Sequence, residues 1–75
     1  MPFAHVRVIE GVFSEDEKRQ IIAKVTEALV SVEGESLRDK TMVIIEEVRS
    51  GDWGIGGMPL TTAAVNELRA GTSTR

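Results

Sequence analysis

The feature that most constrains this chain is one amphipathic helix predicted between two strand-like segments. Ser14 followed three residues later by Glu17 has the spacing of a capping box, and the acidic side chains beside them favour a helix N-terminus. Apolar residues then recur at helical spacing until Gly34, where we expect the helix to end. The apolar set comprises Ile21, Ile22, Val25, Ala28, Leu29 and Val32.

Strand patterns lie on both sides of this helix. Residues 3–10 alternate as a half-buried strand does, and residues 41–48 (TMVIIEEV) are rich in β-branched side chains and predict a buried strand. The first strand has an apolar face that should meet the helix, Ala4, Val6 and Val8, and an opposite face, Phe3, His5, Arg7 and Ile9. Strand, helix and strand in this order predict a β-α-β unit with parallel strands.

The rest of the chain predicts a small addition to this unit. Residues 49–57 (RSGDWGIGG) indicate a turn or tight hairpin, because glycines punctuate them around Trp53 and Ile55. Residues 59–70 predict a short C-terminal helix with a proline near its start, and we expect the tail at 71–75 to be mobile. The predicted fold class is therefore α/β (α+β), one domain over 1–75 with a core at about 2–57 and an extension at 58–75.

Length and composition favour self-association. A chain of 75 residues buries only about 60% of its unfolded surface and needs reinforcement. It has no cysteine for a disulfide, and His5 is the only Cys or His ligand it offers to a structural zinc ion. The strand face from Phe3 to Ile9 also needs cover that one protomer does not supply. We therefore expect an oligomer.

Charge and hydropathy exclude two classes of partner. The net charge is -3 and the basic residues are scattered, whereas a nucleic-acid surface gathers Lys and Arg on one face. The chain lacks the roughly 18–20 consecutive apolar residues of a membrane span, and its start lacks the basic and apolar regions of a signal peptide. We expect a cytoplasmic protein whose partner is a small molecule.

Most catalytic constellations are missing. There is no Cys nucleophile, and a Ser-His-acid triad would have to use His5, which the pattern favours as a surface or interface strand residue. Glu46 and Glu47 adjoin in a strand and so point to opposite faces, which argues against a paired-carboxylate site. The glycines of GDWGIGG lack the Gly-Lys-Ser/Thr ending of a phosphate loop.

Pro2 is the residue that remains. It directly follows the initiator methionine, which is normally removed before so small a residue, and the mature chain would then begin with a secondary amine. Poor solvation or a nearby cation disfavours the protonated form of such an amine and leaves a base that can abstract and return a proton. The alternative is that Pro2 only begins an edge strand, where it needs no N–H donor.

Four segments resemble the 4-oxalocrotonate tautomerase branch of the tautomerase superfamily: PFAHVRVIEG at 2–11, SEDEKRQIIAKVTEAL, VIIEEV and SGDWGIGG. The likeness covers about residues 2–57. It implies β-α-β protomers assembled as a homohexamer, commonly a trimer of dimers. It also implies enol–keto isomerisation of unsaturated 2-hydroxy or 2-oxo acids, as in aromatic catabolism, by an N-terminal proline that shuttles a proton and uses no cofactor.

The resemblance also implies roles for particular residues. Pro2 corresponds to the catalytic base, and Trp53 to the aromatic residue that lines the pocket and keeps it dry. Ile9 and Ile55 match apolar wall positions. Trp53 is equally suited to a subunit contact, and the two interpretations are compatible because large aromatic side chains commonly anchor interfaces.

Two arginines implied by the resemblance are missing. One should follow the EG that ends the first strand and grip a substrate carboxylate, but this chain has Val12 and Phe13 there, with one residue inserted. The other, at the start of the second strand, should stabilise the enolate oxygen or the 1-carboxylate, and it aligns with Met42. Charge-assisted hydrogen bonds contribute about 1.5–3 kcal/mol each, so their loss would reduce catalysis by powers of ten.

Three cations are candidate replacements. Lys40 is predicted on the same strand face as Met42, and Arg7 on the face that points away from the helix. Arg38 lies in the preceding loop, from which it could reach a neighbouring subunit. The alternative for all three is a surface salt bridge with Asp39 or a glutamate.

The leading hypothesis is a tautomerase for a small unsaturated oxo or hydroxy acid, with Pro2 as base and then acid. Its pocket would be more apolar than usual and formed by Val12, Phe13, Met42 and Trp53. One alternative is a non-catalytic or partner-dependent subunit of a hetero-oligomer in which a paralogous chain supplies the arginines. The other is a hydratase or dehalogenase acting on haloacrylates, for which the sequence shows no water-activating carboxylate.

Overall fold

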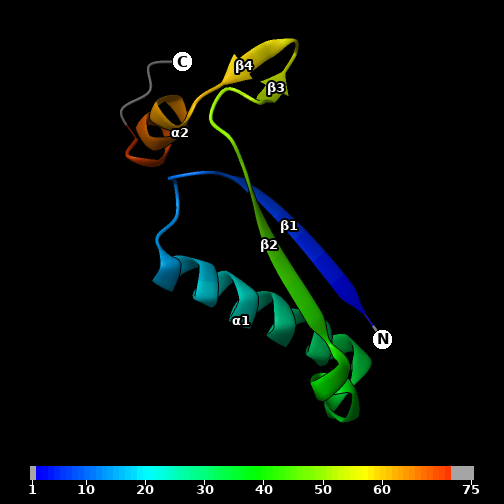
Figure 1. Ribbon diagram of the computed structural model, residues 1–75. Coiled ribbons are helices and arrows are strands. Elements are labelled where there is room, and N and C mark those ends of the chain that lie inside the picture. Colours follow the sequence, from blue (N-terminus) through cyan, green and yellow to red (C-terminus); the bar gives the residue numbers. More distant parts are fainter. Residues whose placement is uncertain (1, 72–75) are drawn as a thin grey trace. The chain divides into compact units, whose positions relative to one another are not determined.

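A computed structural model describes residues 2–71, and Figure 1 shows its helices and strands. The tail predicted at 71–75 lies outside the described residues except for Gly71. The chain divides into two compact units, which are described one at a time. Unit 1 contains the chain up to Arg7 together with Phe13–Glu46, and unit 2 contains Val8–Val12 together with the chain from Glu47 onward.

Strands β1 (Phe3–Ile9) and β2 (Met42–Val48) pair as a two-stranded sheet. At one end the backbone N–H of Met42 donates to the carbonyl of Pro2 at 3.2 Å, and at the other that of Glu10 donates to the carbonyl of Val48 at 2.8 Å. The start of β1 is therefore bonded to the start of β2, and the end of β1 to the end of β2, so the two strands are parallel. This confirms the predicted β-α-β order.

Helix α1 (Glu15–Glu33) lies between these strands in the chain and beside them in unit 1 (Figure 1). The Ser14 hydroxyl accepts a hydrogen bond from the Glu17 N–H at 3.1 Å, and the Glu17 carboxylate accepts one from the Ser14 N–H at 2.9 Å. The helix ends at Gly34, whose φ of 105° lies in the region that favours glycine. Both predicted ends are confirmed.

The buried side of α1 differs in part from the prediction. Val32 is 89% exposed, whereas Val30, which was not in the predicted apolar set, is 4% exposed. The reason is that two polar residues, Thr26 and Glu33, also take half-buried positions on this helix, and each of them makes a hydrogen bond. The Thr26 hydroxyl donates to the Ile22 carbonyl at 2.7 Å, and the Glu33 carboxylate accepts a hydrogen bond from Thr41. Counting apolar residues alone therefore placed the centre of the face too far toward Val32.

A short 3₁₀ helix, η1 (Glu35–Lys40), follows α1 and was not predicted. Its sequence, ESLRDK, is polar and contains no helical apolar period. In a 3₁₀ helix the side chains at i and i+3 lie above one another, which places Arg38 over Glu35. Thr41 ends η1 with its N–H bonded to the Arg38 carbonyl at 3.2 Å.

One face of the β1–β2 pair is exposed. Exposed side chains alternate with half-buried ones over residues 3–7 of β1 and 42–46 of β2, so β2 is half-buried rather than buried as predicted. We call this surface the open sheet face; its residues are Phe3, His5, Arg7, Met42, Ile44 and Glu46. Ile9, which was predicted on the same face, is only 5% exposed, because the strand end belongs to unit 2, where Val8, Ile9 and Val12 are all buried.

Unit 2 contains a hairpin of β3 (Trp53–Ile55) and β4 (Met58–Leu60), which confirms the predicted turn. Gly56 and Gly57 form its two-residue turn with φ values of 58° and 84°, which side chains rarely adopt. Residues flanking such a turn form the hydrogen-bonded pair, so the next pair, Gly54 and Pro59, is the non-bonded one. Pro59 therefore fits in β4 without the loss of a hydrogen bond, and the prediction that it lies in the C-terminal helix is wrong.

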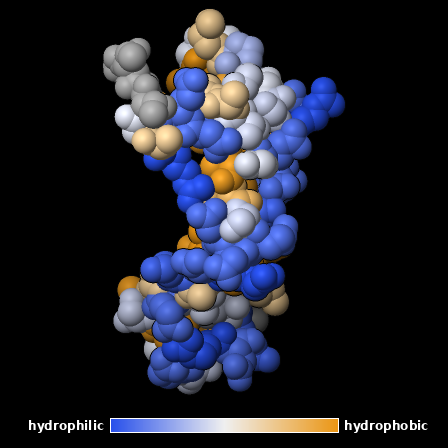
Figure 2. Space-filling view, turned by 90° about the vertical axis from the view of Figure 1, so that its left-hand side faces the viewer, coloured by the Kyte–Doolittle hydropathy of each residue, from blue (hydrophilic) through white to orange (hydrophobic). Residues whose placement is uncertain are grey.

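The C-terminal helix, α2 (Thr62–Arg69), begins after β4. The Thr61 hydroxyl accepts a hydrogen bond from the Ala64 N–H at 3.1 Å and so caps the helix. The surface drawn in Figure 2 is largely hydrophilic, with hydrophobic atoms in limited patches. Between residues 2 and 71, neither helix has the length and hydropathy required to cross a membrane.

Candidate functional site

Pro2 and Met42 are brought together in unit 1. Pro2 is half-buried directly before β1, and its carbonyl accepts the hydrogen bond from the Met42 N–H at 3.2 Å. The exposed Met42 side chain belongs to the open sheet face, so the position where the resemblance implies an arginine is apolar. The removal of Met1 concerns a residue outside those described. The sheet thus holds the main chain of Pro2 at a defined position.

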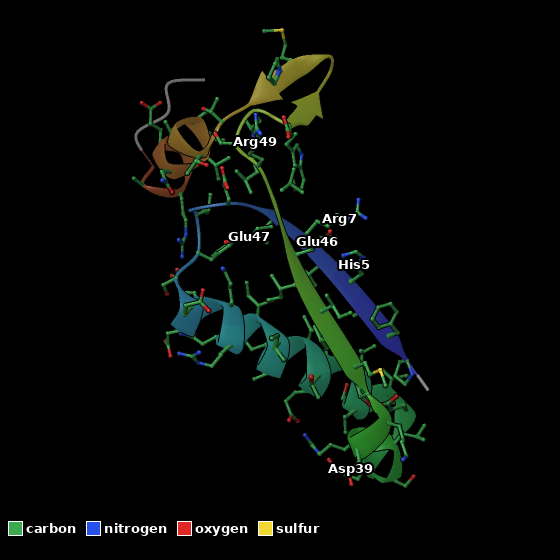
Figure 3. The ribbon with its side chains drawn as sticks, in the orientation of Figure 1. His5, Arg7, Asp39, Glu46, Glu47 and Arg49 are labelled. Carbon is green, nitrogen blue, oxygen red and sulfur yellow. The ribbon has the colours of Figure 1, made fainter. Side chains whose placement is uncertain are left out.

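Arg7 lies on the open sheet face, as predicted. Its Nε is 3.3 Å from Glu46 Oε1, and His5 Nε2 is 2.7 Å from the same oxygen. Figure 3 shows these three side chains on one side of the strands and Glu47 on the other, as adjacent strand residues require. His5 also stacks on Phe3, with ring centroids 6.5 Å apart. The exposed Arg7 pair contributes little to stability, which leaves its cation accessible to a competing carboxylate.

Arg38 is bound inside its own protomer. Its Nη1 and Nη2 lie 2.5 and 3.1 Å from the two carboxylate oxygens of Glu27, and its Nε and Nη2 lie 2.9 and 2.7 Å from those of Glu35. These bonds lower the pKa of both carboxyl groups and raise the pKa of the guanidinium. A guanidinium held by two carboxylates is a poor replacement for a substrate-binding arginine, so the salt-bridge interpretation holds for Arg38.

This cluster predicts a pH dependence of stability. Because Glu27 and Glu35 have a lower pKa when folded than the ordinary 4.5, they stabilise the fold above that pH, and the contribution is lost as the pH falls through the lowered values. We expect the free energy of unfolding, measured by urea denaturation, to fall more steeply below about pH 5 in the wild type than in Arg38→Gln. Arg19→Gln, another substitution in unit 1, should keep the wild-type slope; equal slopes for all three proteins would contradict the prediction.

Lys40 does not lie where the sequence predicted. It is the last residue of η1, and β2 begins only at Met42, so the two side chains do not alternate along one strand. The reason is that Thr41 ends the 3₁₀ turn with its hydroxyl bonded to the Leu37 carbonyl at 2.9 Å. Lys40 remains exposed, and within residues 2–71 it has no carboxylate partner. The argument from a shared strand face no longer supports it as a replacement cation.

The remaining predicted site residues lie in unit 2. Trp53 is half-buried at the start of β3 and pairs with Leu60, while Ile55 is exposed and pairs with Met58. Ile9 is buried among the residues that close β1. The exposed apolar residues of the hairpin are those expected of a wall or contact surface, which fits both interpretations of Trp53.

The segment after β1 is tied to the C-terminal extension. Gly11 has a φ of 79°, and a Cβ built there would lie 3.2 Å from Thr62 Cγ2. The Thr62 hydroxyl donates to the Glu10 carbonyl at 2.6 Å, and Arg69 Nη1 donates to the Val12 carbonyl at 2.9 Å. Arg69 was not among the predicted site residues. It is separated from Val12 by 57 positions, and no local pattern connects them.

Within residues 2–71, no three His, Asp or Glu side chains group closely enough to bind a metal ion. Unit 1 thus holds Pro2 at the start of its sheet and the Arg7 and Glu46 pair on the open sheet face. Unit 2 holds an arginine at the main chain of Val12.

Comparison with known proteins gives a consistent family. The family model described as tautomerase enzyme matches residues 2–63. A probable tautomerase of Dickeya dadantii is 41% identical over 61 residues, which cover 81% of this chain and 90% of the relative. The 2-hydroxymuconate tautomerase of Pseudomonas putida is 41% identical over 58 residues, which cover 77% and 89%.

Solved structures resemble the fold as well. A structure from work on the 4-oxalocrotonate tautomerase isozymes of Methylibium petroleiphilum has a TM-score of 0.69 and 37% sequence identity. The alignment covers 85% of this chain and 97% of that chain. A homologue of 4-oxalocrotonate tautomerase named YwhB gives the same TM-score at 34% identity, over 77% and 92% of the two chains. The match extends over the β-α-β unit and confirms the predicted fold class.

Proposed function

We propose, from the premise that this chain belongs to the tautomerase family, that Pro2 is the base of its reaction. The family match spans residues 2–63, and relatives named as tautomerases identify the chain as an enzyme of the isomerase class. The observation that carries the proposal is the place of Pro2, which is half-buried at the start of the sheet and bonded through its carbonyl to Met42.

The proposed substrate is a small unsaturated 2-hydroxy or 2-oxo acid. A relative of this chain is named for 2-hydroxymuconate, a dienol of this class. The Pro2 nitrogen, exposed by removal of Met1, takes the enol proton while the O–H bonding pair forms the carbonyl. The conjugated double bond shifts, and a carbon atom receives the proton from Pro2. The base is restored, and no other reactant is consumed.

The surroundings of Pro2 support this role. Pro2 is half-buried, and partial burial removes part of its solvation. This desolvation disfavours the protonated amine and favours the free lone pair. An apolar residue at Met42 also favours an acid with an apolar end over one with a second carboxylate there.

The assembly proposed for this enzyme is a homohexamer arranged as a trimer of dimers. Its support is the open sheet face, on which Phe3, Met42 and Ile44 are exposed. In stable folds an apolar sheet face is normally covered by other protein. Ile55 and Met58 of the hairpin are exposed as well. A cover supplied by another copy of the chain would remove these apolar side chains from water.

The test of the proposed function is ketonisation by the purified chain. We expect turnover of 2-hydroxymuconate and of phenylenolpyruvate, measured as the loss of absorbance of each enol. We also expect an intact mass that lacks Met1. If neither acid turns over, or if the active protein retains Met1, the proposal fails.

The partner-dependent alternative is favoured by one observation. Val12 is buried, Met42 is uncharged and Arg38 is held by two carboxylates. None of these three positions therefore offers a cation that is available to a substrate. An active homo-oligomer of this chain alone would exclude it. A chain that becomes active only when mixed with a paralogous subunit would confirm it.

A further inference from the structure

The register of the β1–β2 pair places Thr41 beside Pro2. The backbone N–H of Met42 donates to the Pro2 carbonyl at 3.2 Å, and in a parallel pair this bond sets Met42 opposite Phe3. One residue earlier, Thr41 therefore lies opposite Pro2. The burial pattern agrees, because Phe3 and Met42 are exposed. Pro2 and Thr41 are both half-buried, so they share the sheet face turned to α1, about 5 Å apart.

The last residue of α1 contacts Thr41 on this face. Glu33 Oε2 accepts a hydrogen bond from the Thr41 hydroxyl. The other carboxylate oxygen, Oε1, is buried and has no hydrogen-bond partner within residues 2–71. A buried acceptor without a donor is costly, and the helix dipole also disfavours an anion at a helix C-terminus. A cation that donates to Oε1 would relieve both costs.

The other charged side chains at this end of unit 1 are turned away or already paired. Those of the strands lie on the open sheet face, on the side of the strands opposite to α1 (Figure 3). Those of η1 are exposed or belong to the ion pairs of Arg38. The last turn of α1 contains no basic residue. The side chains in question are His5 and Arg7 on β1, Glu46 on β2, Glu27 on α1, and Glu35, Arg38, Asp39 and Lys40 on η1.

The Pro2 amine has the chemistry that the Glu33 carboxylate needs. Once Met1 is removed, the protonated amine is a cation with N–H donors. Partial burial of Pro2 disfavours this cation, whereas an opposite charge within about 4–6 Å favours it. A group that both takes up and returns a proton works best when its proton affinity is matched to the working pH. The carboxylate therefore offsets the desolvation of the amine and keeps it an effective base.

We propose that Glu33 is a positioning residue of the reaction, whose carboxylate is held by Thr41 and pairs with the protonated Pro2 amine between uptake and return of the proton. In this pair Oε2 accepts from the Thr41 hydroxyl and Oε1 accepts from the amine. The proposal rests on the proposed function for the role of Pro2 and for the removal of Met1. Glu33 acts through Pro2 and does not itself contact the substrate.

The test is the titration of the Pro2 amine in the assembled full-length protein, followed by NMR with an isotope-labelled proline nitrogen and without substrate. Pro59, the other proline, has an amide nitrogen that does not titrate, so the titrating signal belongs to Pro2. Glu33→Gln keeps an acceptor for the Thr41 hydroxyl but removes the charge. We expect the titration midpoint to fall by about one pH unit, because the protonated amine loses its opposite charge. The midpoint of the rising limb of kcat/KM against pH should fall with it.

Three further variants control for charge and fold. Asp39→Asn removes an exposed carboxylate of η1 and should leave the midpoint within about 0.3 pH unit of the wild type, because solvent screens exposed charges. Glu33→Asp keeps the charge on a shorter side chain, so its midpoint should lie between those of the wild type and Glu33→Gln. Glu33→Met has an apolar side chain of similar length, which suits a half-buried position, and should lower the midpoint as Glu33→Gln does. It decides the question if Glu33→Gln does not fold.

The outcomes separate this inference from the proposed function. A folded Glu33→Gln with the wild-type midpoint would overturn the inference, even where turnover depends on Pro2, and so would an equal fall in Asp39→Asn. A midpoint that depends on Glu33, together with a ketonisation rate that Pro2→Ala leaves unchanged, would support the pairing and refute the proposed mechanism. A purified protein that retains Met1 has no Pro2 amine and would overturn both.

Discussion

Replacing Pro2 by alanine is expected to lower kcat/KM for ketonisation by at least about 10²-fold, because general acid–base catalysis by a positioned group typically contributes 10²–10⁴-fold. Alanine is small enough for Met1 removal to continue, but it presents a primary amine on a freely rotating backbone instead of a ring nitrogen. The hydrogen bond from the Met42 N–H to the carbonyl of residue 2 needs no side chain and should survive. The rate is measured from the absorbance of the dienol substrate.

The matched control for this substitution is Pro59→Ala, since Pro2 and Pro59 are the two prolines of the chain. Pro59 lies at a non-bonded position of β4, so alanine fits there without disturbing the hairpin. We expect the control to keep kcat/KM within about threefold of the wild type. A Pro2→Ala enzyme with intact mass lacking Met1 and wild-type activity would show that the base lies elsewhere.

Replacing Ile44 by lysine is expected to break the oligomer. Ile44 is 47% exposed at the middle of the open sheet face, between Met42 and Glu46. Full burial of such a side chain contributes about 1.5–3 kcal/mol, and association can bury only the exposed half of Ile44. A two-fold symmetric contact contains this half twice, so its loss should raise the dissociation constant by about 10- to 10²-fold. Burial of the lysine charge would add to this effect. Sedimentation velocity measures the change in mass.

Val32→Lys provides the comparison. Val32 is also a large apolar residue and is 89% exposed, but it lies on α1 and not on the open sheet face. This variant should sediment like the wild type. If Ile44→Lys also sediments like an oligomeric wild type, the assembly does not use the open sheet face; a monomeric wild type would refute self-association itself.

Local signals in the sequence were sufficient for most of the secondary structure. The capping box at Ser14 and the glycine at Gly34 bound the helix correctly, because caps depend on residues within one turn. The hairpin followed from Gly56 and Gly57, because few residues other than glycine adopt positive φ. Pro59 misled the prediction, since a proline near a helix start and a proline at a non-bonded strand position look alike in sequence.

Errors at the helix and strand faces have a different cause. Val30 is buried and Ile9 is covered because of neighbours that come from elsewhere in the chain. The position of Lys40 at the end of η1 depends on Thr41, whose hydroxyl is bonded to the Leu37 carbonyl at 2.9 Å and also to Glu33. A hydrophobic period records which residues avoid water, but not which polar groups find partners inside.

The candidate site shows the same division. Pro2, Trp53 and the glycine-rich segment are recognisable from their order along the chain, as is the lack of arginines at Val12 and Met42. Sequence alone therefore determined the order of elements, the family likeness and the candidate base. Only the tertiary structure decided that Arg38 is neutralised in its own protomer and that Arg69 lies at the Val12 carbonyl. Charged groups far apart in the chain pair according to how the backbone brings them together, and that depends on contacts no local pattern contains.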